Sequence, residues 1–132
     1  MKFLLDTNIC IYLINRKPSS VRQHLELIPP NDVFISSITA SELWYGVYKS
    51  KFVEKNTIAL ITFLSTINVL PFDEKASISY GEIRVAFEKS GEIIGANDLL
   101  IAAHALSLDY NLITNNEREF KKITQLKVLN WE

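Results

Sequence analysis

Short apolar runs alternate with longer amphipathic stretches along the whole of this chain. Apolar runs of a few residues bounded by turn formers predict β-strands, and the stretches between them have the spacing of amphipathic helices. The predicted strands are Lys2–Asp6, Val33–Ser36, Ile67–Leu70, Asn111–Thr114 and Lys127–Leu129. Strands that alternate with helices in this way form a parallel sheet covered by helices. We therefore predict an α/β fold with a central parallel sheet.

Length and composition are typical of one ordinary globular domain, which we expect to span residues 1–132. The net charge of −1 excludes the global basic field that many nucleic-acid-binding proteins carry. The single cysteine, Cys10, excludes an intramolecular disulfide and is typical of a reducing compartment. The amino terminus enters the first predicted strand without a signal peptide, and the longest uncharged stretch, 57–72, is too short to cross a bilayer. We expect a cytoplasmic protein without membrane contact.

Asp6 stands at the carboxyl end of the first predicted strand. Ligands of open α/β sheets bind beyond the carboxyl ends of the strands, so an acid at this place is well positioned for function. Aspartate is also a favoured N-cap, and Asp6 could simply cap a helix that begins near Asn8. Both interpretations remain open for this residue.

Two further acids, Glu42 and Asp98, stand near the predicted starts of later helices. Thr39 and Glu42 have the spacing of a capping box, which would explain Glu42 structurally. Asn97 or Asp98 could likewise cap the helix that follows them. That helix is apolar on nearly every face, which predicts burial and would leave Asp98 in a recess.

A cluster of these carboxylates would repel itself unless a cation relieved the repulsion. Oxygen ligands without cysteine or histidine favour magnesium or manganese over zinc. Magnesium held by few carboxylates can activate a water and neutralise a phosphate, so phosphodiester hydrolysis is the reaction that such a cluster predicts. No glycine-rich phosphate loop is present, which argues against a nucleotide-binding protein of the Rossmann or P-loop type.

Five stretches in order carry a more specific signal: FLLDTNICIYLI, ISSITASELWYGV, LPFDEKASISYGEIR, IGANDLLIAAHALSL, and LITNNEREF followed by LKVLNW. Together they resemble the PIN-domain ribonuclease toxins of bacterial toxin–antitoxin pairs, the VapC family, over essentially the entire chain. The resemblance implies a small three-layer α/β/α sandwich around a central parallel five-stranded sheet. It implies a magnesium-dependent endoribonuclease, with manganese able to substitute, that cuts a structured RNA such as the transfer RNA anticodon loop.

The same resemblance implies partners. The expected partners are an RNA substrate, a second copy in a homodimer, and a cognate VapB-like antitoxin whose tail blocks the active site. DNA would be contacted only through the antitoxin.

Carried over by position, Asp6, Glu42 and Asp98 match the catalytic and metal-binding acids of the family. Thr7 and Asn8 match the signature that follows the first acid, where they are expected to orient Asp6 by hydrogen bonds.

The chain departs from the family near the end of the fourth predicted strand. Many members carry an aspartate two positions after the threonine that corresponds to Thr114, and this chain has Asn116 there. Asn116 could offer a neutral oxygen, while Glu119 or Glu117 could supply a fourth charge. One well-held ion is therefore expected rather than two.

Two alternatives come from other classes of protein. A receiver-like phosphoacceptor domain also gathers acids above a parallel sheet, but it needs paired acids after the first strand, where Asp6 stands alone. A non-catalytic protein-binding module could use Trp44, Tyr48 and Phe52, which have helical spacing. Core packing is the commoner meaning of such a stripe.

Overall fold

The computed structural model describes residues 1–132 and contains one sheet of five parallel strands. The strands lie in the order β3–β2–β1–β4–β5. Their bounds are β1 Phe3–Leu5, β2 Val33–Ser36, β3 Asn68–Leu70, β4 Asn111–Ile113 and β5 Val128–Leu129. Each observed strand falls within its predicted range, so the prediction of a central parallel sheet is confirmed.

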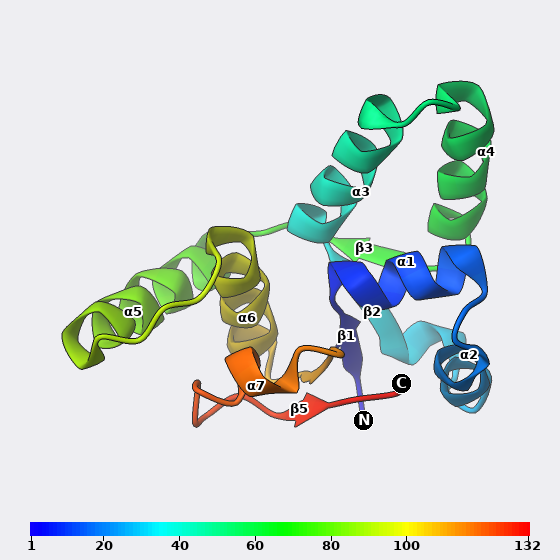
Figure 1. The fold of residues 1–132 in the computed structure, drawn as a ribbon. Coiled ribbons are helices and arrows are strands. Elements are labelled where there is room, and N and C mark those ends of the chain that lie inside the picture. Colours follow the sequence, from blue (N-terminus) through cyan, green and yellow to red (C-terminus); the bar gives the residue numbers. More distant parts are fainter.

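Seven α-helices and one short 3₁₀ turn, Pro30–Asp32, connect the strands (Figure 1). The helices are α1 Thr7–Asn15, α2 Ser19–Glu26, α3 Ser37–Lys49, α4 Val53–Leu64, α5 Glu74–Ser90, α6 Ala96–Leu108 and α7 Glu117–Phe120. No helix is both long and apolar enough to cross a lipid bilayer.

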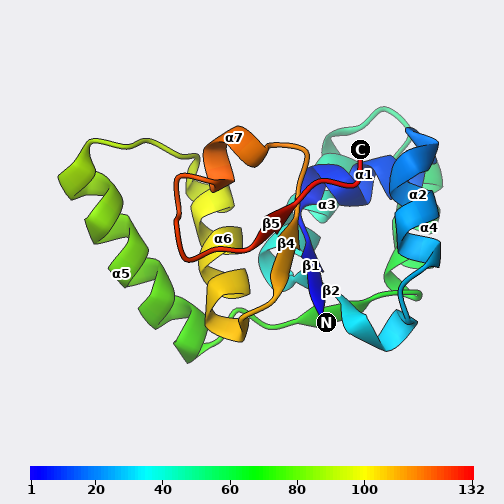
Figure 2. The ribbon, with the colours of Figure 1, turned by 90° about the horizontal axis from the view of Figure 1, so that it is seen from below.

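Helices cover both faces of the sheet. Figure 2 shows α5 and α6 on one side of the strands and α1, α2 and α4 on the other. Leu4 belongs to an apolar cluster with side chains of α5, α6 and α7, whereas Phe3 and Leu5 belong to a second cluster with side chains of α1 to α4. Successive side chains of a strand point to opposite faces, which produces this division. The predicted three-layer sandwich is thus confirmed.

The starts of α3 and α6 differ from the prediction. Ser36, the last residue of β2, is the N-cap of α3, and its hydroxyl accepts a hydrogen bond from the Ile38 N–H at 3.1 Å. Thr39 is therefore a buried residue inside the helix, and the predicted capping box is wrong. Helix α6 begins after Gly95 without a side-chain cap, so neither Asn97 nor Asp98 caps it.

Core packing explains only part of the aromatic stripe: Trp44 is partly buried against the cluster shared with α1 and α4, but the other two residues are not. Tyr48 and Phe52 are 68% and 67% exposed, so core packing does not explain them. The fully buried residues of α3 are Thr39, Leu43 and Val47, of which Leu43 and Val47 pack into the cluster shared with α1 and α4.

Candidate active site at the carboxyl edge of the sheet

Three helices begin at one edge of the sheet and bring the three predicted acids to that edge (Figure 1). Parallel strands end at the same edge, and Asp6 follows β1 directly. Glu42 lies in the second turn of α3, which follows β2, and Asp98 lies in the first turn of α6. Residues far apart in the sequence therefore approach one another here.

Asp6 is almost completely buried, with 3% of its surface exposed. Its Oδ1 accepts a hydrogen bond from the Ile9 N–H at 2.9 Å, which makes Asp6 the N-cap of α1. Burial is the main reason why the pKa of Asp6 is raised to about 6, against hydrogen bonds from Thr114 and Ile9 that lower it. The negative charges of Asp98 and Glu42 add to the rise. Asp6 thus both caps α1 and belongs to a group of repelling carboxylates.

Glu42 is held by side chains from two other helices. The Thr7 hydroxyl donates to its Oε1, and the Asn97 amide donates to its Oε2 at 3.0 Å. Thr7 follows Asp6 in the chain, and Asn97 precedes Asp98, so each donor is the sequence neighbour of another acid. The sequence predicted that Thr7 would orient Asp6, but its hydroxyl donates to Glu42 instead.

Asn97 is a site residue that sequence reasoning missed, since it was considered only as a helix cap. The available signal was its place directly before Asp98 in the first turn of a helix, but the sequence does not show that Glu42 lies opposite.

Asp98 is half-buried, and burial raises its pKa, with smaller contributions from the charges of Glu42 and Glu119. Glu119 lies in α7 and also forms an ion pair with Lys122 at 3.2 Å. The structure therefore adds Glu119 to the acids around Asp98. Glu117 instead forms an ion pair with Lys121 at 3.2 Å and accepts a hydrogen bond from the Asn130 amide at 3.3 Å.

Three further residues were predicted to support the site: Thr114, Asn116 and Asn8. Thr114 is buried, and its hydroxyl accepts a hydrogen bond from the Asn116 N–H at 2.9 Å. Asn116 occupies the N-cap position of α7, but its side chain makes no capping hydrogen bond. Asn8 is exposed and forms no side-chain hydrogen bond, so it does not orient Asp6 as predicted.

The acids at this edge of the sheet can hold only certain kinds of metal ion. No group of three acidic, histidine or cysteine side chains lies close enough together to hold one ion directly. Magnesium does not need such a group, because it is usually bound by one or two carboxylates and keeps several waters. Burial, with a smaller contribution from the neighbouring negative charges, raises the pKa of both Asp6 and Asp98. A bound divalent cation would stabilise the charged forms of both carboxylates. The residues present therefore fit a hydrated hard cation.

Comparison with known proteins identifies the fold and the family. The PIN domain model matches residues 3–126. Ribonuclease VapC2 of Rickettsia felis is 48% identical, with 100% of this chain and 99% of the relative covered. The tRNA(fMet)-specific endonuclease VapC of Shigella flexneri is 41% identical, with 99% and 98% covered.

Solved structures agree with these matches. VapBC2 of Rickettsia felis, bound to a DNA fragment from its promoter, superposes with a TM-score of 0.93 at 46% identity over 100% of both chains. DNA-bound VapBC of Salmonella typhimurium gives a TM-score of 0.94 at 39% identity over 100% of this chain and 99% of the other. Nucleases with a PIN domain generally depend on divalent metals. The chain therefore belongs to the PIN-domain family and, within it, to the VapC ribonucleases.

Proposed function

We propose that residues 1–132 form a single nuclease domain that acts as the toxin of a VapBC-type pair. The reaction is the magnesium-dependent hydrolysis of phosphodiester bonds in a structured RNA, such as the anticodon loop of a transfer RNA. The observation that carries the proposal is the group of carboxylates at the carboxyl edge of the sheet, where Asp6 has a pKa of about 6. The name of the Shigella flexneri relative, a tRNA(fMet)-specific endonuclease, supports the substrate class.

Asp6 and Asp98 would hold the ion, with Glu42 beside them. A bound Mg²⁺ supplies a water of lowered pKa and neutralises charge on the scissile phosphate. The hydrogen bonds from Thr7 and Asn97 restrict the Glu42 carboxylate to one orientation. Preorganised groups of this kind lower the barrier because they need no rearrangement during the reaction.

The start of α6 supports the binding of a phosphate next to the acids. This helix lacks a side-chain cap, so the N–H groups of its first turn are available to an external acceptor. The positive end of a helix dipole also favours an anion. A phosphate of the RNA placed beside Asp98 would meet these groups.

An apolar groove beside the acids fits the inhibitory tail of an antitoxin. A pocket of about 300 Å³ lies between α1, α3 and α4, and Glu42 is one of its lining residues. Most of its other lining side chains are apolar, among them Ile14, Leu43, Val47 and Leu60. An apolar segment in this groove could extend an arginine or lysine to the acids, where it would compete with the metal. The relatives solved as VapBC complexes with DNA support an antitoxin partner and an assembly that binds DNA. The contact with DNA through the antitoxin and the homodimer are further parts of this proposal.

The test uses purified protein and a synthetic RNA hairpin with the anticodon stem and loop of tRNA(fMet). Cleavage should require Mg²⁺ or Mn²⁺, stop with EDTA, and leave 5′-phosphate and 3′-hydroxyl ends. Asp98→Asn should abolish cleavage, while Glu88→Gln, an exposed acid of α5, should not. Cleavage in EDTA that leaves a 2′,3′-cyclic phosphate would overturn the proposal, because the ribose hydroxyl would then be the nucleophile.

A further inference from the structure

Besides the apolar groove between α1, α3 and α4, a second pocket adjoins the acids, and residues of α1, α3 and α6 line it. It has a volume of about 410 Å³ and is lined by Thr7, Ile38, Ser41, Glu42, Tyr45 and Asn97. Glu42 also lines the apolar groove, so this carboxylate stands between the two hollows. Only two of the six residues that line this second pocket are hydrophobic. The pocket is thus continuous with the candidate catalytic group but differs in chemistry from the groove between α1, α3 and α4.

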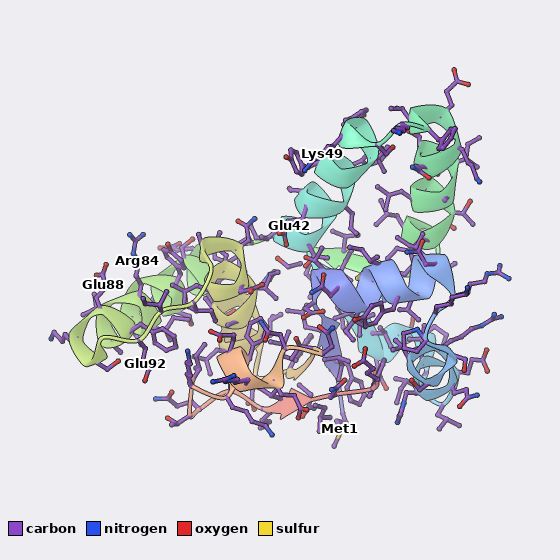
Figure 3. The ribbon with its side chains drawn as sticks, in the orientation of Figure 1. Met1, Glu42, Lys49, Arg84, Glu88 and Glu92 are labelled. Carbon is purple, nitrogen blue, oxygen red and sulfur yellow. The ribbon has the colours of Figure 1, made fainter.

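Tyr45 is the aromatic wall of this pocket. Its side chain is 67% exposed, and it lies one turn after Glu42 on the same face of α3. Lys49 lies one turn further, and its Nζ stands 5.6 Å from the centre of the Tyr45 ring. Figure 3 shows Glu42 and Lys49 on the side of α3 that is turned away from α4. An acid, an exposed aromatic ring and a cation therefore follow one another along a single helix face.

We propose that this pocket is a nucleotide subsite, in which an unpaired base next to the scissile bond stacks on Tyr45 and its phosphate contacts Lys49. The inference rests on the proposed ribonuclease function and names how the RNA is held. A loop nucleotide that is cut must be unstacked from its neighbours, and proteins bind such bases on aromatic side chains. The chain has a net charge of −1, so cations near the acids must supply the attraction for the RNA backbone.

The chemistry of the pocket favours RNA over the apolar tail of an antitoxin. An inhibitory apolar segment would find its apolar contacts in the groove between α1, α3 and α4, where six of the ten lining residues are hydrophobic. Tyr48 has nearly the same exposure as Tyr45 but lies outside the pocket and stacks on Trp44 at 5.8 Å. A base on Tyr45 would displace only the Lys49 ammonium from the ring, and this cation would then be free to contact the phosphate of the same nucleotide.

The experiment measures kcat and KM for the tRNA(fMet) anticodon hairpin in Mg²⁺. Tyr45→Ala and Tyr45→Leu should raise KM about tenfold to a hundredfold, because stacking on one aromatic side chain has this value. Tyr45→Trp should keep KM near the value of the unmodified protein, since it keeps a stacking surface. Tyr48→Ala is the matched control on the same helix and should leave KM unchanged.

Lys49 is tested by the salt dependence of binding. Asp98→Asn protein and the fluorescein-labelled hairpin give Kd by anisotropy at several salt concentrations. Lys49→Gln in that background should reduce the slope of log Kd against log salt by about 0.7, the value for one contact with a single-stranded phosphate. Lys89→Gln, in the last turn of α5, should leave the slope unchanged.

The outcomes separate this inference from the proposed function. An inactive unmodified protein would contradict the proposed function, and the anisotropy measurements would still test the subsite. An active protein in which Tyr45→Ala and Tyr48→Ala have the same KM would overturn the subsite alone. If Tyr45→Ala leaves KM unchanged but loses a dimer in sedimentation or binds the antitoxin more weakly, this face binds a protein partner. That result would also overturn the subsite.

Discussion

Two regions of the candidate site hold a carboxylate by different means. At the end of β1, Asp6 is held by burial and by a backbone N–H of its own helix, three residues along the chain. In the second turn of α3, Glu42 is held by Thr7 and Asn97, which lie 35 and 55 residues away. Burial raises the pKa of Asp6, although the N–H of Ile9 partly opposes this rise, whereas the two hydrogen bonds to Glu42 fix the direction of its oxygens. Charge and orientation in this site are thus controlled by separate contacts.

The largest expected effect is the loss of cleavage in Asp6→Asn, together with a gain in stability of the metal-free protein. The folded pKa of about 6 exceeds the ordinary value of 3.8, so the folded state binds the proton more tightly. The free energy of unfolding of the unmodified protein in EDTA should therefore fall as the pH rises from about 4 to about 6. The total loss should be up to about 3 kcal/mol.

Urea unfolding of both proteins in EDTA at several pH values measures this effect. Asp6→Asn should be more stable than the unmodified protein at pH 8 and similar to it at pH 4, and Glu88→Gln should follow the unmodified protein. An equal difference at both pH values would show that the charge of Asp6 is not the cause.

The next effect concerns metal addition and pH. Mg²⁺ should raise the free energy of unfolding by roughly 2.7 kcal/mol at a concentration of 100 Kd, because it binds only the folded protein. This gain should be present above pH 6 and should shrink as Asp6 becomes protonated below it. Thermal unfolding with Mg²⁺ or EDTA at pH 5 and pH 8 measures the gain, and a gain retained in Asp98→Asn would place the ion elsewhere.

A smaller effect is expected when Glu42 loses its fixed orientation. Thr7→Val and Asn97→Ala should each lower kcat or metal affinity about tenfold. Loss of a residue that orients a metal ligand typically costs about 10- to 100-fold, so this effect is at the low end of that range. The low end is expected for Asn97 because its side chain is exposed. Thr7→Ser keeps the hydroxyl and should recover most of the activity. Calorimetric titration with Mn²⁺ measures affinity, and a Thr7→Ser protein as weak as Thr7→Val would contradict the role of the hydroxyl.

The smallest effect is expected near α7. Either Glu119 or Asn116 would supply the oxygen that an aspartate supplies in many members of the family. The charge of Glu119 already contributes to the raised pKa of Asp98, whereas the Asn116 side chain makes no capping hydrogen bond. Glu119→Gln should therefore weaken Mg²⁺ binding a few-fold. Asn116→Asp should change the magnesium concentration for half-maximal cleavage less than Glu119→Gln does. The reverse order would assign the fourth oxygen to Asn116.

The sequence by itself determined the strands, the parallel sheet and the place of Asp6. Strands buried on both faces are continuous apolar runs, and a cap depends on residues within one turn, so both signals are local. The apolar run before Asp6 and the N–H of Ile9 are all that this acid requires.

Tertiary structure decided the cap of α3, the environment of Glu42 and the exposed face of α3. Ser36, Ser37 and Thr39 could each cap a helix by sequence, but Ser36 is the last residue of β2, and its hydroxyl also contacts Nδ1 of His104 at 2.8 Å. The donors to Glu42 come from α1 and α6, whose positions over the sheet no local pattern encodes. Helical spacing groups Tyr45 with Lys49 but does not show which side of α3 is buried, because that depends on the helices that pack against it.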